Sequence, residues 1–179
     1  MAITDSLTGC YNRSFLTQEL ELQAKEYINN RIPFSIILLD IDFFKSINDS
    51  YGHLVGDRVL RDTVEVIQHS LRIHDILARY GGEEFIICLP NTQLNQANII
   101  AERVKSTIES NRIIIQEDTP PISITVSIGL LSTDHMEIDI SKDVQAILNE
   151  LFESVDRALY QAKSDGRNRI VSSSGIHLR

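Results

Sequence analysis

The chain has 179 residues, enough for one domain with a sizeable core, and 42% of them are apolar. Its formal net charge of -8 argues against general binding to a nucleic acid backbone, although a few local cations could still hold one nucleotide. No apolar run is long enough to span a membrane, because Asp40 and Asp42 interrupt the one that begins at Phe34. Cys10 and Cys88 fit neither a metal site nor a disulfide framework, so we expect free thiols and a reducing, cytoplasmic location.

In chain order, the first expected element is a helix that Asn12 caps and that runs to about Asn29. The nearly all-apolar run from Phe34 to Asp40 predicts a central strand buried on both faces. A short helix is expected over Lys45–Ser50, followed by a glycine-containing loop over Tyr51–Gly56.

Asp57 is expected to cap the next helix, which ends near Leu71. Gly81-Gly82 favours a two-residue turn between two antiparallel strands, Ile76–Tyr80 and Glu84–Leu89. The later elements are expected as a helix over Leu94–Asn111, a short strand over Ile113–Ile115, a turn at Pro120-Pro121, a long strand over Ile122–Leu131, a helix over Asp143–Lys163 and an edge strand over Arg169–Ser172.

Apart from the additional elements, the order is strand, helix, strand, strand, helix, strand, which is the split βαβ or ferredoxin-like arrangement of an α+β fold. In that arrangement the first and third strands are antiparallel neighbours, so Asp40 should lie beside Glu83 and Glu84. Carboxylates that meet in this way repel one another unless a cation joins them, and Mg²⁺ prefers such oxygen ligands. Taken alone, Asp40 and Asp42 could cap a helix and the two glutamates could be solvated; together they favour a metal site.

The segment Gly81-Gly82-Glu83-Glu84-Phe85 resembles the GGDEF signature of the diguanylate cyclase family, in its GGEEF form. The resemblance spans almost the whole chain, since further segments are similar to family motifs in the same order: Asp5-Ser-Leu-Thr-Gly9, Asn12-Arg13, Asp40-Ile-Asp42-Phe-Phe-Lys45, Ile47-Asn48-Asp49, Gly52-His53, Gly56-Asp57, and Lys163 with Gly166 and Arg167. It implies a βαββαβ core of the nucleotidyl cyclase and polymerase palm type, with helices flanking the sheet and extra elements at both ends. It also implies one GGDEF domain over residues 1–179, which we expect to be a module of a longer protein with an upstream regulatory domain.

By this resemblance the protein is an enzyme that condenses two GTP molecules into cyclic di-GMP and releases two pyrophosphates. Asp40, Glu83 and the backbone carbonyl of Ile41 would hold Mg²⁺ or Mn²⁺. Glu83 and Glu84 would share the catalytic duty: one would take the proton from the ribose 3′-hydroxyl or hold the metal that lowers its pKa. Which glutamate does which stays open, with Glu83 slightly favoured as the ligand. Lys45 would stabilise the transition state.

The resemblance also implies that Asn48 and Asp57 read guanine. Guanine presents two neighbouring N–H donors that suit a carboxylate, and adenine lacks that pair. His53 could either contact the nucleotide or pack within its loop, and the sequence does not separate these alternatives.

The triphosphate would be held at the start of the short helix, by backbone N–H groups around Phe43, Phe44 and Lys45. Both phenylalanine rings are expected to pack rather than to stack on a base. Lys163 and Arg167 are expected to contact the triphosphate, although the dipole of the last helix would also favour cations at its C-terminal end.

Arg72-Ile-His-Asp75 matches the family's product-inhibition site, with Arg103 as a further contact, although Arg72 and Asp75 alone could be a surface ion pair. Cyclic di-GMP would bind there and hold two domains apart. Each domain brings one GTP, so the working form should be a two-fold homodimer. The alternative is a non-catalytic sensor of GTP or cyclic di-GMP; an RNA-binding module is disfavoured by the acidic balance. We expect no nucleic acid partner and no membrane insertion of this domain, which could still belong to a membrane-anchored protein.

Overall fold

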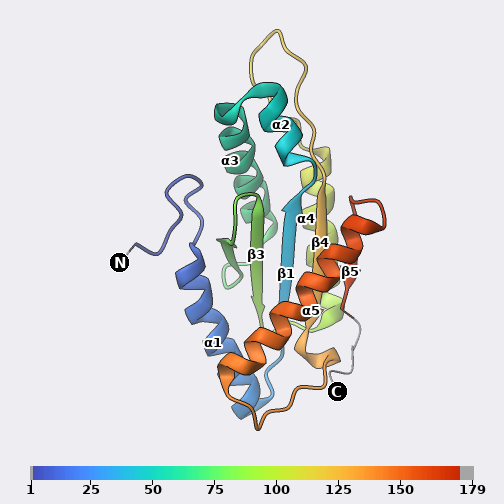
Figure 1. The fold of residues 1–179 in the computed structure, drawn as a ribbon. Helices are drawn as coiled ribbons and strands as arrows, with labels where there is room; N and C mark the ends of the chain where they lie inside the picture. The colour runs from blue at the N-terminus through green and yellow to red at the C-terminus, as the bar shows by residue number, and fades with distance from the viewer. Residues whose placement is uncertain (1, 174–179) are drawn as a thin grey trace.

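The computed structural model describes residues 2–173 and consists of a five-stranded sheet covered by helices (Figure 1). The strands lie in the order β2-β3-β1-β4-β5, and every neighbouring pair is antiparallel except β4 and β5. Their bounds are β1 Phe34–Ile41, β2 Ile76–Arg79, β3 Glu84–Pro90, β4 Val126–Ser132 and β5 Ile170–Ser172. The first four strands have the ferredoxin-like order, so the predicted α+β fold is confirmed, and β5 extends one edge.

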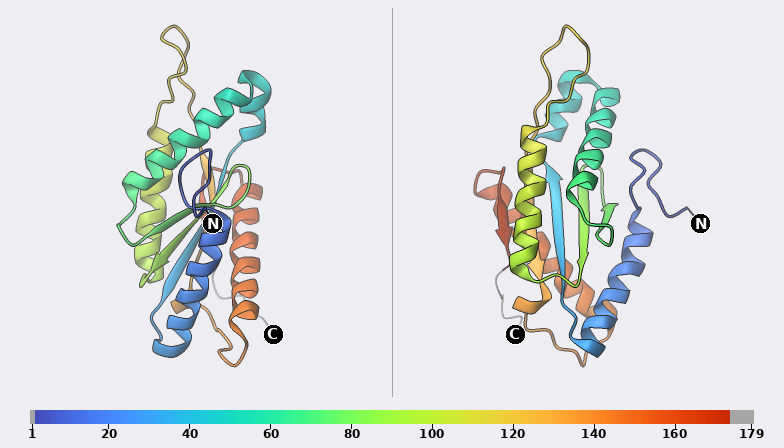
Figure 2. Two further views of the ribbon diagram at one scale, coloured as in Figure 1. Left: turned by 90° about the vertical axis from the view of Figure 1, so that its left-hand side faces the viewer. Right: turned by 180° about the vertical axis from the view of Figure 1, so that it is seen from behind.

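Helices cover both faces of this sheet (Figure 2). Helices α1 (Arg13–Asn30) and α5 (Val144–Ser164) pack on one face, and α3 (His53–Ser70) and α4 (Leu94–Ser110) pack on the other. Helix α2 (Phe44–Tyr51) follows the C-terminal end of β1, and a short 3₁₀ helix, Thr133–His135, follows β4. Among the helices of residues 2–173, none has both the length and the apolar character needed to cross a membrane.

Strand β1 is buried along its whole length because both of its faces are covered. Ile37 and Leu39 join the core beneath α3 and α4, whereas Ile36 and Leu38 join the core beneath α1 and α5. This double burial explains the uninterrupted apolar run. Side chains alternate along a strand, so Asp40 falls on the α5 side of the sheet.

Helix α5 packs directly against the backbone of β4 at Gly129. A Cβ atom at this position would lie 2.4 Å from the carbonyl oxygen of Val155 and 2.6 Å from the backbone nitrogen of Leu159. Glycine therefore permits the close approach of α5 to the sheet, and this approach brings the end of α5 near the end of β1.

Most of the predicted elements are confirmed to within a few residues, including the cap that Asn12 provides to α1. The predicted loop over Tyr51–Gly56 is wrong, because α3 already begins at His53. Gly52, with φ 86°, ends α2 and begins α3 at the same residue, a geometry that glycine adopts readily. Asp57 consequently lies inside α3 and does not cap it.

The predictions for residues 112–125 are also partly wrong. The expected strand Ile113–Ile115 is reduced to a single bridge between Ile113 and Ile122, and β4 begins only at Val126. The segment extends beyond the end of the sheet in Figure 1, where it has no further strand to pair with.

Candidate active site

Acidic residues meet at one edge of the sheet, as the topology predicts. Asp40 lies opposite Glu84 in the β1–β3 pairing, and the backbone N–H of Ile41 donates to the carbonyl oxygen of Glu83 at 3.3 Å. Asp40 is only 7% exposed. Burial raises the pKa of its carboxyl group to about 6; Lys163 opposes this rise, and the charges of Glu83 and Glu84 add to it.

Lys163, at the end of α5, forms an ion pair with this carboxylate: its Nζ lies 2.8 Å from Oδ2 of Asp40. The other oxygen of Asp40, Oδ1, accepts no hydrogen bond from residues 2–173. In the same part of the chain, no three Asp, Glu, His or Cys side chains are grouped closely enough to hold a metal ion. A cation at this edge would therefore need oxygen atoms from the backbone or from a ligand as well.

Arg79 holds the turn that carries the two glutamates, a role that the sequence analysis missed. Its guanidinium donates to the carbonyl oxygens of Gly81 at 3.2 Å and Gly82 at 2.8 Å, and pairs with Asp5 at 3.3 Å. The predicted two-residue Gly-Gly turn is wrong, because the backbone N–H groups of Tyr80 and Gly81 both reach the carbonyl oxygen of Glu84. Of the described glycines, the two in this turn are not among those with positive φ, which a tight hairpin turn of this kind would require.

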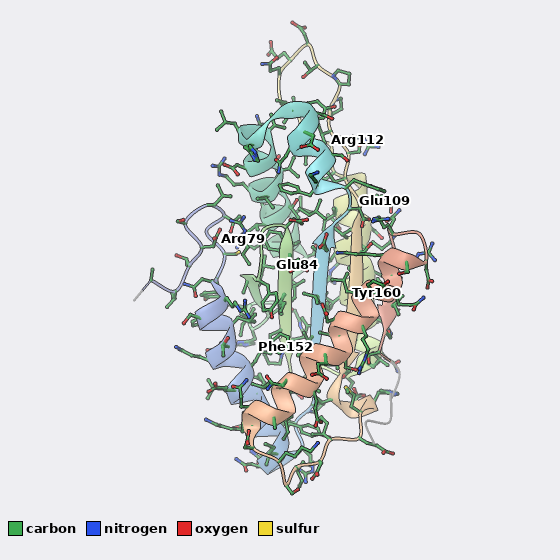
Figure 3. All side chains as sticks on the ribbon, viewed as in Figure 1. Arg79, Glu84, Glu109, Arg112, Phe152 and Tyr160 are labelled. Carbon is green, nitrogen blue, oxygen red and sulfur yellow. The ribbon has the colours of Figure 1, made fainter. Side chains whose placement is uncertain are left out.

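Gly81 serves a different purpose, because it leaves room for Glu84. A Cβ atom on Gly81 would lie 2.9 Å from Oε2 of Glu84. Figure 3 shows Glu84 at the start of β3, with Arg79 at the end of the adjacent strand β2. In the sequence Arg79 stands two residues before Gly81, but nothing there indicates that its acceptors are the carbonyl oxygens of the turn.

A cleft of about 470 Å³ opens beside the turn and collects most of the predicted nucleotide-binding side chains. It is lined by Phe44, Lys45, Asn48, His53, Asp57, Leu60, Arg79, Gly82 and Glu83. The side chains of Lys45, His53, Asp57 and Glu83 make no hydrogen bond or ion pair with other residues of 2–173, so they are available to a ligand. Other residues predicted for the metal and the nucleotide do not line this cleft: Asp40, Ile41, Phe43, Glu84, Lys163 and Arg167.

Asn48 contributes an acceptor to the cleft that has no partner. Its Oδ1 atom is buried and accepts no hydrogen bond within residues 2–173. Helix α3 approaches this side chain at Gly56, where a Cβ atom would lie 1.8 Å from Oδ1. An unpaired buried acceptor costs about 1–3 kcal/mol, so a ligand that donates a hydrogen bond here would recover that free energy.

The start of α2 differs from the prediction in one respect. Phe44 is buried, as expected, but Phe43 is 64% exposed, so its assignment as a packing residue is wrong. Phe43 adopts a left-handed conformation with φ 57° at the N-cap of α2. The guanidinium of Arg167 lies over the exposed ring, 4.7 Å from its centroid. Arg167 thus lies next to the backbone that the sequence analysis assigns to phosphate binding.

Asp42 does not cap the following helix, contrary to the simpler interpretation of this residue. Its carboxylate accepts hydrogen bonds from the hydroxyl groups of Thr125 at 2.7 Å and Ser127 at 2.6 Å, and from the backbone N–H of Asn168 at 3.0 Å. It therefore links the end of β1 to β4 and to the loop that follows α5.

The residues of the predicted inhibitory site lie at the turn after α3. Arg72 pairs with Asp75 at 3.0 Å and also donates to the hydroxyl of Thr92. The side chain of Asp75 is fully buried, while that of Arg72 is 46% exposed. Arg103 donates to the backbone carbonyl of Ser70, so it caps the end of α3 close to Arg72. A second cleft, of about 320 Å³, includes Arg72 and Asp75 in its lining.

Comparison with known proteins identifies the family. Residues 2–169 match the family described as "Diguanylate cyclase, GGDEF domain", and the chain belongs to this family. The response regulator PleD of Caulobacter vibrioides is 37% identical over 174 residues, which cover 97% of this chain and 37% of PleD. Diguanylate cyclase A of Treponema denticola is 42% identical over 139 residues, which cover 78% of this chain and 35% of that protein. The chain thus spans little more than a third of the length of these relatives.

Solved structures show the same fold. The GGDEF domain of DgcB from Caulobacter crescentus, crystallised in complex with c-di-GMP, superposes with a TM-score of 0.84 at 30% identity and covers 97% of this chain and 94% of that one. An active GGEEF domain of a diguanylate cyclase from Vibrio cholerae has a TM-score of 0.77 at 33% identity, with coverages of 92% and 97%.

Proposed function

We propose that this domain condenses two GTP molecules into one cyclic di-GMP and two pyrophosphates. One observation carries the proposal: the buried carboxylate of Asp40 and the turn of Glu83 and Glu84 adjoin a cleft that presents the unpaired Oδ1 of Asn48 and the unpaired carboxylate of Asp57. The two halves of this arrangement suit the two halves of the substrate, a metal-bound triphosphate and a guanine base.

The acidic edge suits a divalent cation, Mg²⁺ or Mn²⁺. Cyclases of this family generally use divalent metal ions. The donors would be the carboxylates of Asp40 and Glu83 and the backbone carbonyl of Ile41, all hard oxygen ligands. The raised pKa of Asp40 supports this assignment, because a cation would relieve the crowding of negative charge that burial makes unfavourable. When bound, the metal would neutralise phosphate charge and lower the pKa of the ribose 3′-hydroxyl.

The guanine base would enter the cleft between α2 and α3. The carboxylate of Asp57 would accept from N1–H and the exocyclic amine, and Asn48 would accept or donate along the remaining edge. His53 lines the same cleft and is available to the nucleotide. Adenine would leave Asp57 without a donor, which predicts discrimination against ATP.

The phosphates would lie at the start of α2, over its backbone N–H groups, with Lys45 on the cleft side and Arg167 over Phe43. Lys163 holds Asp40 in the described geometry and would contact the triphosphate from the same side. Either Glu83 or Glu84 would accept the proton of the 3′-hydroxyl as its oxygen attacks the α-phosphorus of the other GTP. The bond to the pyrophosphate leaving group then breaks, and a second such attack closes the ring.

Each domain would bring one GTP, so we propose a two-fold homodimer as the working form. The rate of synthesis should therefore rise with about the square of protein concentration while most of the protein is monomeric.

Product inhibition at Arg72 and Asp75 is also part of the proposal. It is supported by the cleft beside this pair, by the exposed guanidinium of Arg72 and by the ability of arginine to recognise phosphate or guanine. The variant Arg72→Ala should synthesise cyclic di-GMP without inhibition by added product. Inhibition of this variant at the wild-type product concentration would contradict the assignment.

The proposal is tested by incubating concentrated protein with GTP and Mg²⁺ and identifying the products by liquid chromatography and mass spectrometry. We expect cyclic di-GMP and two equivalents of pyrophosphate, and no reaction with ATP. The variant Glu83→Gln should be inactive, whereas Glu102→Gln, which changes an exposed carboxylate on α4, should match the wild type. Bound but unchanged GTP would instead support a non-catalytic sensor.

A further inference from the structure

Asp42 is a buried carboxylate whose environment differs from that of Asp40. It is 5% exposed and forms no ion pair with any residue of 2–173. Its negative charge is held by hydrogen bonds alone, two from hydroxyl groups near the start of β4 and one from a backbone N–H after α5. A buried charge without a cationic partner is expensive to retain, which points to a role for Asp42 beyond packing.

Two strained backbone segments meet at this carboxylate. Phe43, directly after it, has φ 57°, while Arg167 and Asn168 have φ 64° and 46°. Left-handed conformations are unfavourable for residues other than glycine and persist only where the surroundings fix them. The N–H of Asn168 donates to Oδ2 of Asp42, so one side chain links both segments.

A second contact, through the side chain of Asn168, supports the loop that follows α5. The side-chain amide of Asn168 donates to Oε1 of Glu109 on α4 at 3.0 Å; Glu109 is labelled in Figure 3 beside the end of α5. With Asn168 held at both its backbone and its side chain, the preceding Arg167 lies over the ring of Phe43.

We propose that Asp42 is a positioning residue: through the backbone of Asn168 it holds the guanidinium of Arg167 at the start of α2, where it recognises the triphosphate of the nucleotide. This inference rests on the proposed function, because it takes the start of α2 as the phosphate site. It assigns Asp42 to neither metal binding nor proton transfer. Loss of Asp42 should weaken recognition of phosphates and leave recognition of the base unchanged, since Asn48 and Asp57 lie on other elements.

The test compares two probes that share a base and differ in phosphate. A GTP analogue with a methylene group between the α- and β-phosphorus cannot react, and guanosine carries no phosphate. Affinities of both for the full chain with Mg²⁺ are measured by NMR titration. We expect Asp42→Ala to bind the analogue about tenfold more weakly, as for a lost charge-assisted hydrogen bond, and guanosine as tightly as the wild type does.

Further variants separate positioning from a general structural role. Asp42→Asn can present its amide oxygen to Asn168 and should restore most of the affinity for the analogue. Arg167→Ala should lower the affinity for the analogue to the same extent, and the double variant with Asp42→Ala should bind it little more weakly than either single variant. The matched control Ser127→Ala removes one hydrogen bond to Asp42 and leaves that to Asn168, so it should lower stability without changing the ratio of the two affinities.

If Asp42→Ala does not fold, the combined variant Asp42→Leu, Thr125→Val, Ser127→Ala replaces the carboxylate and both hydroxyl donors by apolar groups and should show the same selective loss. Equal weakening of both probes, an unchanged affinity for the analogue, or additive effects of Asp42→Ala and Arg167→Ala would each overturn the inference. A selective loss in Asp42→Ala, together with a wild-type protein that binds both probes but forms no cyclic di-GMP, would refute the proposed function alone. A wild-type protein that binds neither probe would refute both.

Discussion

Replacing Asp40 by asparagine should stabilise the metal-free protein at neutral pH. The carboxyl group of Asp40 has a pKa of about 6 in the folded state, against 3.8 for an ordinary aspartate. The folded state therefore binds the proton more tightly than the unfolded state. The stability that this proton contributes is fully present below pH 3.8 and is lost as the pH rises through 6. Asparagine stays neutral throughout and keeps that contribution.

The magnitude follows from the difference between the two pKa values, which corresponds to about 3 kcal/mol. In the Asp40→Asn variant the amide oxygen can still accept a hydrogen bond from Lys163, so the ammonium group keeps a polar partner. We expect the free energy of unfolding of Asp40→Asn, relative to that of the wild type, to rise by up to about 3 kcal/mol between about pH 4 and about pH 7.5.

Urea unfolding, followed by far-ultraviolet circular dichroism in the presence of a chelator, measures this difference. Other titrating groups contribute about equally to both proteins, so the change with pH isolates Asp40. Addition of Mg²⁺ at the upper end of this pH range should then reduce the difference in unfolding free energy between the two proteins, since the ion stabilises only the wild type, which binds it. Without Mg²⁺, a difference in unfolding free energy that stays constant between these pH values, or that shrinks as the pH rises, would refute the reasoning.

Three further substitutions test the construction of the cleft and the sheet. Gly56→Ala should push the side chain of Asn48 out of place and raise the KM for GTP by about tenfold or more, measured by pyrophosphate release. Arg79→Ala should release the turn that carries Glu83 and lower kcat more than it changes KM in the same assay. Gly129→Ala should force α5 away from β4 and lower the free energy of unfolding by about 1–3 kcal/mol in urea titrations. Each idea fails if its variant behaves like the wild type.

Much of the fold could be predicted because local patterns and topology agree. The all-apolar run of β1 indicated burial on both faces, and the order of elements then placed Asp40 beside Glu84. The predicted start of α3 was wrong, because Asp57 looks like a helix cap while the glycine at which the chain turns, Gly52, lies five residues earlier. Single-residue conformations of this kind depend on the packing of both helices.

Side-chain partners that come from distant segments were the least predictable part of the site. Nothing near Asp42 in sequence indicates that its carboxylate is bound by Thr125, Ser127 and Asn168. Arg79 was likewise assigned no role, since its acceptors are backbone carbonyls of a turn whose shape the sequence did not define. Such contacts follow from the three-dimensional arrangement rather than from any local pattern.

Binding of Mn²⁺ in the presence of the methylene GTP analogue tests the central claim most directly, because free and bound Mn²⁺ differ in electron paramagnetic resonance. We predict that the wild-type protein binds the ion together with the analogue, and that Asp40→Asn and Glu83→Gln each lose it while Glu102→Gln retains it. Retention of bound Mn²⁺ by both Asp40→Asn and Glu83→Gln would contradict a metal centre at the ends of β1 and the glutamate turn, and with it the proposed cyclase site.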